Sequence, residues 1–156
     1  YKRQVETSRS GREQFRDVRT AAFDRVMYAE NLMQPAFRFI GAFTPDSGYE
    51  LMKQAITKLG DTLPHGFIVA NDTMAVGALR ALNEAKIEVP QRVSVISFND
   101  VAVAKFTTPP LSTVHAATDQ MGQTAVELLQ ARIKDPKRVP RQVNFKSELM
   151  MRASSL

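Results

Sequence analysis

Short apolar segments that alternate with helical patterns constrain the fold of this chain more than any other feature. The segments "FIVA" (67–70) and "VSVIS" (93–97) are almost entirely apolar, and a helical pattern follows the first of them at once. Continuous runs of this kind are typical of strands that are buried on both faces of a sheet. Because strands that alternate with helices form parallel sheets, the sequence predicts an α/β fold.

The remaining periodicity supplies the other elements of this fold. We expect helices over residues 12–32, 48–60, 72–86 and 118–134, and strands over residues 36–43, 67–70, 93–98 and 141–151. The first helix would bury one stripe, which consists of Phe15, Val18, Ala22, Val26 and Ala29. Ser47 and Glu50 have the spacing of a capping box that opens the second helix, and Gly60 is suited to its end.

The composition is that of a globular domain without disulfides. The chain has 156 residues, of which 44% are hydrophobic and none is cysteine, and its net charge is +5. Basic residues gather in segments 9–19 and 131–142. Contact with nucleic acid is one interpretation of these segments, but acidic residues interleave them, which favours solvated surfaces. No apolar run approaches the roughly 18 residues of a membrane-spanning helix, so we expect no contact with a membrane.

Polar side chains follow the two most apolar strands at the point where each strand ends. Asn71 and Asp72 follow the first strand, and Asn99 and Asp100 follow the second. Ligands of open parallel sheets bind beyond the carboxyl ends of the strands. We predict that Asp72 is the N-cap of the following helix and that Asn71 points toward a ligand. Phe43 lies in a third loop of the same edge, where it either stacks on a ligand or belongs to the core.

Among these residues we find no set that predicts an enzyme. Capping explains Asp72 and Asp100, and His65 and His115 stand apart from any nucleophile motif. The phosphate-binding glycine patterns and the spacing of metal ligands are absent from the sequence. We therefore expect a protein without enzymatic activity, metal or cofactor.

A longer pattern extends over residues 69–155. It consists of "VANDTMAVGALRAL", "VPQRVSVISFND", "PPLSTV" and "ELMMRASS", in this order. The pattern closely resembles the lac/gal repressor family of bacterial transcription regulators, and "FTTPPLSTV" with Asn99 is most similar to repressors of the evolved-β-galactosidase type. The resemblance implies a parallel-sheet lobe of three αβα layers, from an effector domain of the type I periplasmic-binding-protein kind.

The resemblance also implies a division of the chain and a function. Residues 1–115 and 148–156 would form the C-terminal lobe, and residues 116–147 would supply a crossover helix and strand of the N-terminal lobe. The DNA-binding headpiece has no counterpart in these residues, so operator DNA would be bound only through that missing part. The implied protein is a cytoplasmic, homodimeric repressor whose small effector, a sugar or galactoside, binds between the lobes and alters operator affinity. A transport-type sugar-binding protein of the same fold is the alternative.

Individual residues take their roles from the same resemblance. The effector contacts would be Arg19, Phe43, Asn71 and Asn99. Asn99 stands where the family mostly has Asp, which weakens that contact because charge-assisted hydrogen bonds are stronger. Ala22 stands in place of a usual Gly, and Ala116 stands in place of a Gln of some members.

The dimer contact would be formed by the start of one helix and a nearby loop. Its residues would be Met74, Ala75, Val76 and Phe106, the last within the loop 101–107. The alternative is that the three helical residues face the sheet. Lys86 stands in place of a usual Gly, and a left-handed backbone there would cost a lysine roughly 1 kcal/mol or more.

Overall fold

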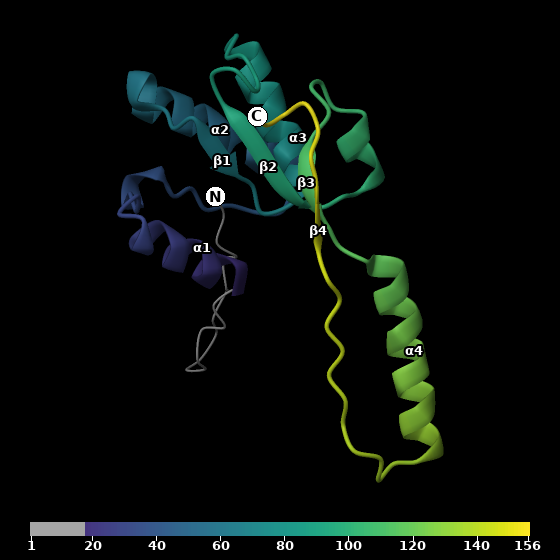
Figure 1. The fold of residues 1–156 in the computed structure, drawn as a ribbon. Helices are drawn as coiled ribbons and strands as arrows, with labels where there is room; N and C mark the ends of the chain where they lie inside the picture. Colours follow the sequence, from purple (N-terminus) through teal and green to yellow (C-terminus); the bar gives the residue numbers. More distant parts are fainter. Residues whose placement is uncertain (1–17) are drawn as a thin grey trace.

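The computed structural model describes residues 18–156, which form a four-stranded sheet with helices (Figure 1). The strands lie in the order β1 (Gly66–Ile68), β2 (Ser94–Asn99), β3 (Ser112–His115) and β4 (Glu148–Met150). The first three are parallel, and β4 pairs antiparallel to β3. The helices are α1 (Val18–Ala29), α2 (Pro45–Leu59), α3 (Asp72–Glu84) and α4 (Thr118–Lys134). The predicted α/β fold with a mainly parallel sheet is confirmed.

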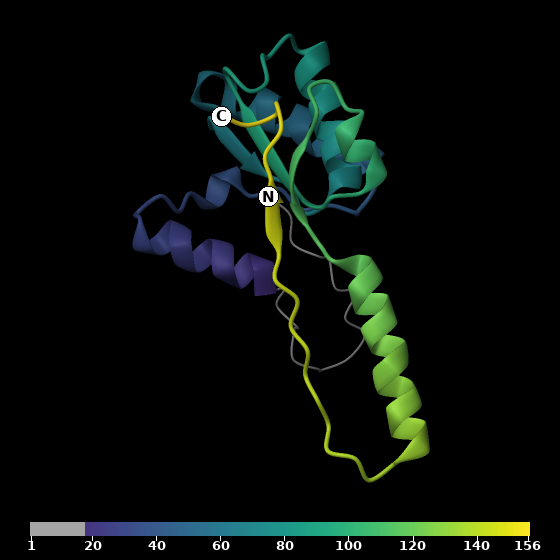
Figure 2. The same ribbon diagram turned by 45° about the vertical axis from the view of Figure 1, so that its right-hand side comes forward.

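Helices α2 and α3 pack together and cover one face of the sheet (Figures 1 and 2). Two glycines allow their close approach. A Cβ atom on Gly48 would lie 2.0 Å from the carbonyl oxygen of Met74, and one on Gly77 would lie 1.9 Å from that of Pro45. The first turns of the two helices are therefore locked side by side, and the loops before them lie at the same edge of the sheet.

Strand pairing determines which residues face α3. Val95 and Ser97 are two positions apart in β2, so they lie on the same face of the sheet. Thr113 of β3 is the register partner of Ser97, and all three residues are buried. Ile96 and Phe98 point to the opposite face and are half-buried. Because side chains alternate along a strand, Asn99 and its partner His115 continue the α3 face beyond the start of that helix.

The helix ends agree with most of the expected signals. Gly60 (φ 48°) ends α2 as expected, and the backbone of Lys86 (φ 58°) is left-handed. The predicted capping box at Ser47 is wrong. Helix α2 begins three residues earlier than predicted, at Pro45, and the side chain of Thr44 accepts a hydrogen bond from the backbone N–H of Ser47. A proline at the first helical position favours this earlier start, because its missing N–H needs no partner there.

The segment 36–43, predicted as a strand, does not form one. A 3₁₀ turn, η1 (Pro35–Phe37), overlaps its start, and residues 38–43 have no strand pairing. Within the described residues β1 is one of the two edge strands of the sheet and pairs with β2 alone. Alternating residues predict a strand only where a neighbouring strand supplies the hydrogen bonds.

Helix α1 is present, but the stripe predicted for burial is exposed. Val18 and Val26 are exposed, whereas Thr20 and Asp24 are buried. Asp24 forms an ion pair with Arg38, which ties this polar side of α1 to the following segment. Phe15 and the basic residues 9–17 lie outside the described residues.

Helix α4 extends away from the sheet as the outer part of a long arm (Figure 2). It contributes no buried residue, and the chain returns from it in extended form to β4. Met121, Leu129 and Ile133 are among its exposed apolar side chains. No helix in the described part of the chain is long and apolar enough to cross a membrane.

Candidate ligand-binding site

Two asparagines lie at matching positions where neighbouring parallel strands end. Ile68 of β1 is the register partner of Ile96 of β2, and Asn71 and Asn99 each follow three residues later. Asn99 is exposed, and its backbone (φ 108°) leaves the strand in a conformation that few non-glycine residues adopt. The carboxyl edge of the sheet therefore presents two amide side chains side by side.

Arg19 of α1 reaches the same edge. Its Nη1 donates a hydrogen bond of 2.8 Å to the carbonyl oxygen of Ala70, the residue before Asn71. Its guanidinium also lies over the ring of Phe98, 5.3 Å from the centroid, and Phe98 precedes Asn99. These two contacts place the cation near the carboxyl ends of β1 and β2, on the face of the sheet to which Phe98 points.

The prediction that Asp72 is the N-cap of α3 is wrong. Asn71 is the N-cap of α3, because its Oδ1 accepts a 2.8 Å hydrogen bond from the backbone N–H of Met74. Its extended backbone (φ −158°) is typical of a cap position. The cap engages the amide oxygen, and no described residue forms a hydrogen bond with Nδ2.

Asp72 is instead the centre of a buried polar network. Its side chain is inaccessible to solvent and accepts hydrogen bonds from the hydroxyls of Ser97 and Thr113, the latter at 2.6 Å. The other carboxylate oxygen accepts from the backbone N–H of Val101 at 2.8 Å. Because Asp72 lies in the first turn of α3, the helix dipole also stabilises its negative charge. Asp72 thereby joins α3, two strands and the loop that follows Asn99.

A second polar network connects three elements at the edge. Asp100 Oδ1 accepts a 2.5 Å hydrogen bond from Arg152, and Asp100 Oδ2 lies 3.2 Å from His115 Nδ1. Burial acts to raise the pKa of Asp100, but the hydrogen bond and charge of Arg152, with a smaller contribution from His115, lower it below its ordinary value. The carboxylate is therefore ionised at neutral pH and accepts from both partners.

Phe43 lies in the loop before α2. Its side chain is half-buried and packs against the apolar core of the lobe. Phe43 therefore belongs partly to the core, as one of the two alternatives holds. Its stacking on a ligand stays a prediction.

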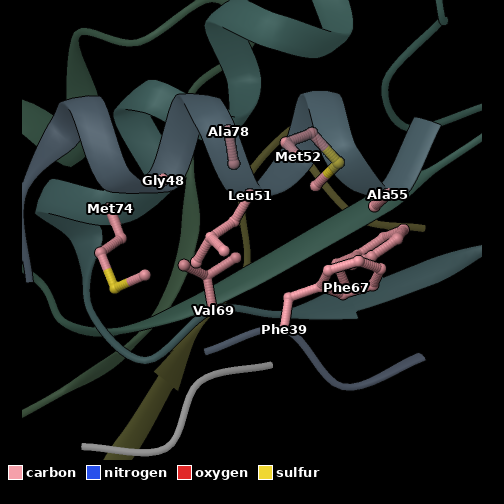
Figure 3. Close-up of a pocket in the computed structure, with 9 residues that line it drawn as sticks. All are labelled: Phe39, Gly48, Leu51, Met52, Ala55, Phe67, Val69, Met74 and Ala78. Carbon is pink, nitrogen blue, oxygen red and sulfur yellow. The ribbon is translucent and has the colours of Figure 1, made fainter. Parts of the chain in front are cut away.

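The apolar cavity beside α2 is separate from these polar groups (Figure 3). Its volume is about 30 Å³, and its walls include Leu51, Met52, Phe67 and Met74. Ligand sites for small molecules have volumes of roughly 300–1,000 Å³. This cavity is a packing gap of the core and does not suit a sugar.

Two of the four predicted dimer contacts are wrong. Met74 and Ala75 are 2% and 0% exposed, because they face α2 and the sheet, as the alternative interpretation holds. Val76 is half-buried, and Phe106 is 81% exposed beside the exposed Val101 and Val103. An interface through Phe106 and its loop stays a prediction.

Sequence reasoning missed the network of Asp100, His115 and Arg152. The three residues are separated by up to 52 positions and meet only through the pairing of β2, β3 and β4. His65, the other histidine, lies before β1 at the opposite edge. Groups of three or more residues that could hold a metal ion are absent from the described residues.

A family model for the periplasmic binding protein-like domain matches residues 5–155. The chain belongs to this family. The predicted resemblance to regulators of the lac/gal type is also confirmed. The narrower resemblance to the evolved-β-galactosidase type stays a prediction.

Similar members of the periplasmic binding protein-like family are transcription regulators by name. The chain is 97% identical over 152 residues to the HTH-type transcriptional regulator GalR of Lacticaseibacillus casei, a match that covers 97% of this chain and 46% of that protein. The chain spans somewhat under half the length of the curated relatives it matches.

Two solved structures show the same arrangement of elements. A LacI family transcriptional regulator from Lactobacillus casei with bound sucrose has a TM-score of 0.78 and 27% identity, over 88% of this chain and 50% of its own. The lac repressor dimer bound to operator and the anti-inducer ONPF also has a TM-score of 0.78 and 27% identity, over 89% of this chain and 47% of its own.

Proposed function

We propose that this chain is the effector-sensing part of a DNA-binding transcriptional repressor and that its effector is a sugar. The observation that supports this proposal most strongly is that Arg19, Asn71 and Asn99 all lie at the carboxyl edge of the parallel sheet. This edge is where sheets of this type bind ligands. The sugar-bound relative and the regulator names of other relatives support this function over a transport-type binding protein.

The chemistry of the edge suits a hydroxyl-rich ligand. Arg19 and the Nδ2 of Asn71 supply donors, while the amide of Asn99 supplies both a donor and an acceptor. Sugar hydroxyls also donate and accept. Phe43 would pack on the apolar face of the ring, from the loop before α2.

The ligand would lie between this lobe and a second one. The exposed arm of residues 116–147 supports this division, because α4 presents apolar side chains that no described residue covers. We propose that the arm belongs to the second lobe and that residues 18–115 and 148–156, with the preceding segment, form the first. Ligand binding would then favour one angle between the lobes and so alter operator affinity.

The proposal also covers the cellular compartment, the oligomeric state and the contact with DNA. The protein would act in the cytoplasm as a homodimer, with Phe106 in the subunit contact, and would bind operator DNA through a headpiece outside these residues. The lac repressor dimer on its operator supports this assembly. We propose no catalytic step, and no metal or cofactor takes part.

Titration calorimetry of the full-length protein that contains these residues tests the proposal. The ligands are galactose, lactose and sucrose, and the variant is Asn99→Ala. We expect at least one sugar to bind and the variant to lose about tenfold in affinity, because hydrogen bonds contribute about 1 kcal/mol each. Asn83→Ala is the matched control, since Asn83 is an exposed asparagine near the other end of α3. Equal affinity of wild type and Asn99→Ala would contradict the proposed site.

A further inference from the structure

His115 lies in a row of polar residues across the edge of the sheet. It is the register partner of Asn99 on one side and of Glu148 on the other. Register partners project to the same face of a sheet, so His115 shares the face of Asn99. Its side chain is 45% exposed. The imidazole is therefore next to the proposed ligand position and accessible from it.

The orientation of the ring is fixed by its neighbours. Asp100 Oδ2 lies 3.2 Å from Nδ1, and Arg152 holds the other oxygen of the same carboxylate. An ionised carboxylate can only accept, so Nδ1 carries the proton that it shares with Asp100. In the neutral ring Nε2 is then an acceptor. No described residue forms a hydrogen bond with Nε2.

The predicted effector contacts supply more donors than acceptors. Arg19 has donors only, and the oxygen of Asn71 already accepts a hydrogen bond from the backbone N–H of Met74. Each sugar hydroxyl carries a hydrogen that needs an acceptor when the ligand leaves water. Asn99 supplies one acceptor, and Nε2 of His115 supplies a second beside it.

We propose that His115 is a ligand-contacting residue that sets specificity, with the neutral Nε2 accepting a hydrogen bond from a ligand hydroxyl next to Asn99. The proposal rests on the proposed function of this edge. It assigns Asp100 and Arg152 as positioning residues, because they fix the tautomer and the plane of the ring.

The experiment compares full-length wild type with His115→Leu and His115→Gln by titration calorimetry. The ligand is the sugar of the panel galactose, lactose and sucrose that wild type binds most tightly. We expect His115→Leu to lose about tenfold in affinity, because leucine supplies no acceptor. His115→Gln keeps an acceptor, so we expect near wild-type affinity.

A matched control and a second readout separate this role from a structural one. His65→Leu makes the same change at the opposite edge of the sheet, and we expect its affinity to equal that of wild type. The second readout is the recovery of affinity in His115→Gln, because an acceptor alone would not restore a site whose structure had been lost.

The outcomes are distinct for the two proposals. Wild type that binds no sugar of the panel would overturn the proposed function and, with it, this contact. Wild type that binds a sugar, together with a His115→Leu variant of equal affinity, would overturn the role of His115 and leave the proposed function intact. A His115→Gln variant that loses as much affinity as His115→Leu would also contradict the acceptor role.

Discussion

Thr113 Oγ1 donates a 2.6 Å hydrogen bond to the carboxylate of Asp72, and neither side chain is accessible to solvent. The contact joins the first turn of α3 to β3, two elements that are 41 positions apart. A buried carboxylate is stabilised only where its oxygens are fully satisfied, and Asp72 also accepts from Ser97 and from the N–H of Val101. This network holds the loop after Asn99 against the start of α3.

Removal of the carboxylate should therefore destabilise the lobe. We expect Asp72→Ala to lower the free energy of unfolding by about 3 kcal/mol, because three donors lose their acceptor in a buried place. Urea denaturation measures the change. Thr73→Ala, at the exposed neighbouring position, is the control and should change stability by less than about 0.5 kcal/mol. A stable Asp72→Ala protein would show that the network is not needed for folding.

The two roles of Asn71 can be separated by one substitution. Asn71→Asp keeps the oxygen that caps α3 and removes the Nδ2 donor, so we expect unchanged stability and a loss of sugar affinity of about tenfold. Asn71→Ala removes both groups and should also lower stability by about 1 kcal/mol. Thermal unfolding and calorimetry measure the two effects. Equal sugar affinity of Asn71→Asp and wild type would mean that this asparagine is only a cap.

The close approach of α2 and α3 predicts a strong effect at Gly77. A methyl group there would lie 1.9 Å from the carbonyl oxygen of Pro45, so the helices would have to separate. We expect Gly77→Ala to destabilise the lobe by about 3 kcal/mol. Gly122→Ala is the matched control in α4, where a Cβ atom meets no atom within 4 Å, and it should stabilise by about 0.5–1 kcal/mol. Equal unfolding midpoints for the two variants would contradict the described packing.

The pKa of Asp100 predicts how stability changes in acid. Because Arg152 and His115 lower this pKa in the folded state, the folded protein binds the proton less readily than the unfolded chain does. The resulting stabilisation is present above about pH 4, near the unfolded value, and is lost as the pH falls through the lowered value. Asp100→Asn should remove it, so the variant should be less stable than wild type at neutral pH and less sensitive to acid. Parallel acid-unfolding curves for the two proteins would contradict this assignment.

The order of elements could be predicted because each strand carries its own signal. The apolar runs around Phe67 and Val95 indicate strands by themselves. The spacing of Met74, Ala78 and Leu82 indicates the buried stripe of α3. The exposed stripe of α1 and the unpaired segment 36–43 could not be predicted in this way. Their state depends on what packs against them: among the described residues nothing buries Val18 and Val26, and no strand pairs with residues 38–43.

The role of each residue within the site was harder to predict than the place of the site on the sheet. The sequence indicated the carboxyl edge through its two Asn-Asp pairs, but not which member of the first pair caps α3. That choice depends on Ser97 and Thr113, which lie opposite Asp72 and draw its carboxylate into the core. Strand register, which also brings His115 beside Asn99, cannot be read from the spacing of residues along the chain.

Hydrogen–deuterium exchange of the full-length protein, with and without the sugar that it binds most tightly, tests the central claim most directly. We predict that added sugar slows exchange in peptides that contain Asn71 and in those that contain residues 99–101 and 115, at the carboxyl edge. Peptides around His65 and Ser94, at the opposite edge, should exchange at unchanged rates. Protection that is confined to the opposite edge, or that is absent from the carboxyl edge, would contradict the proposed site.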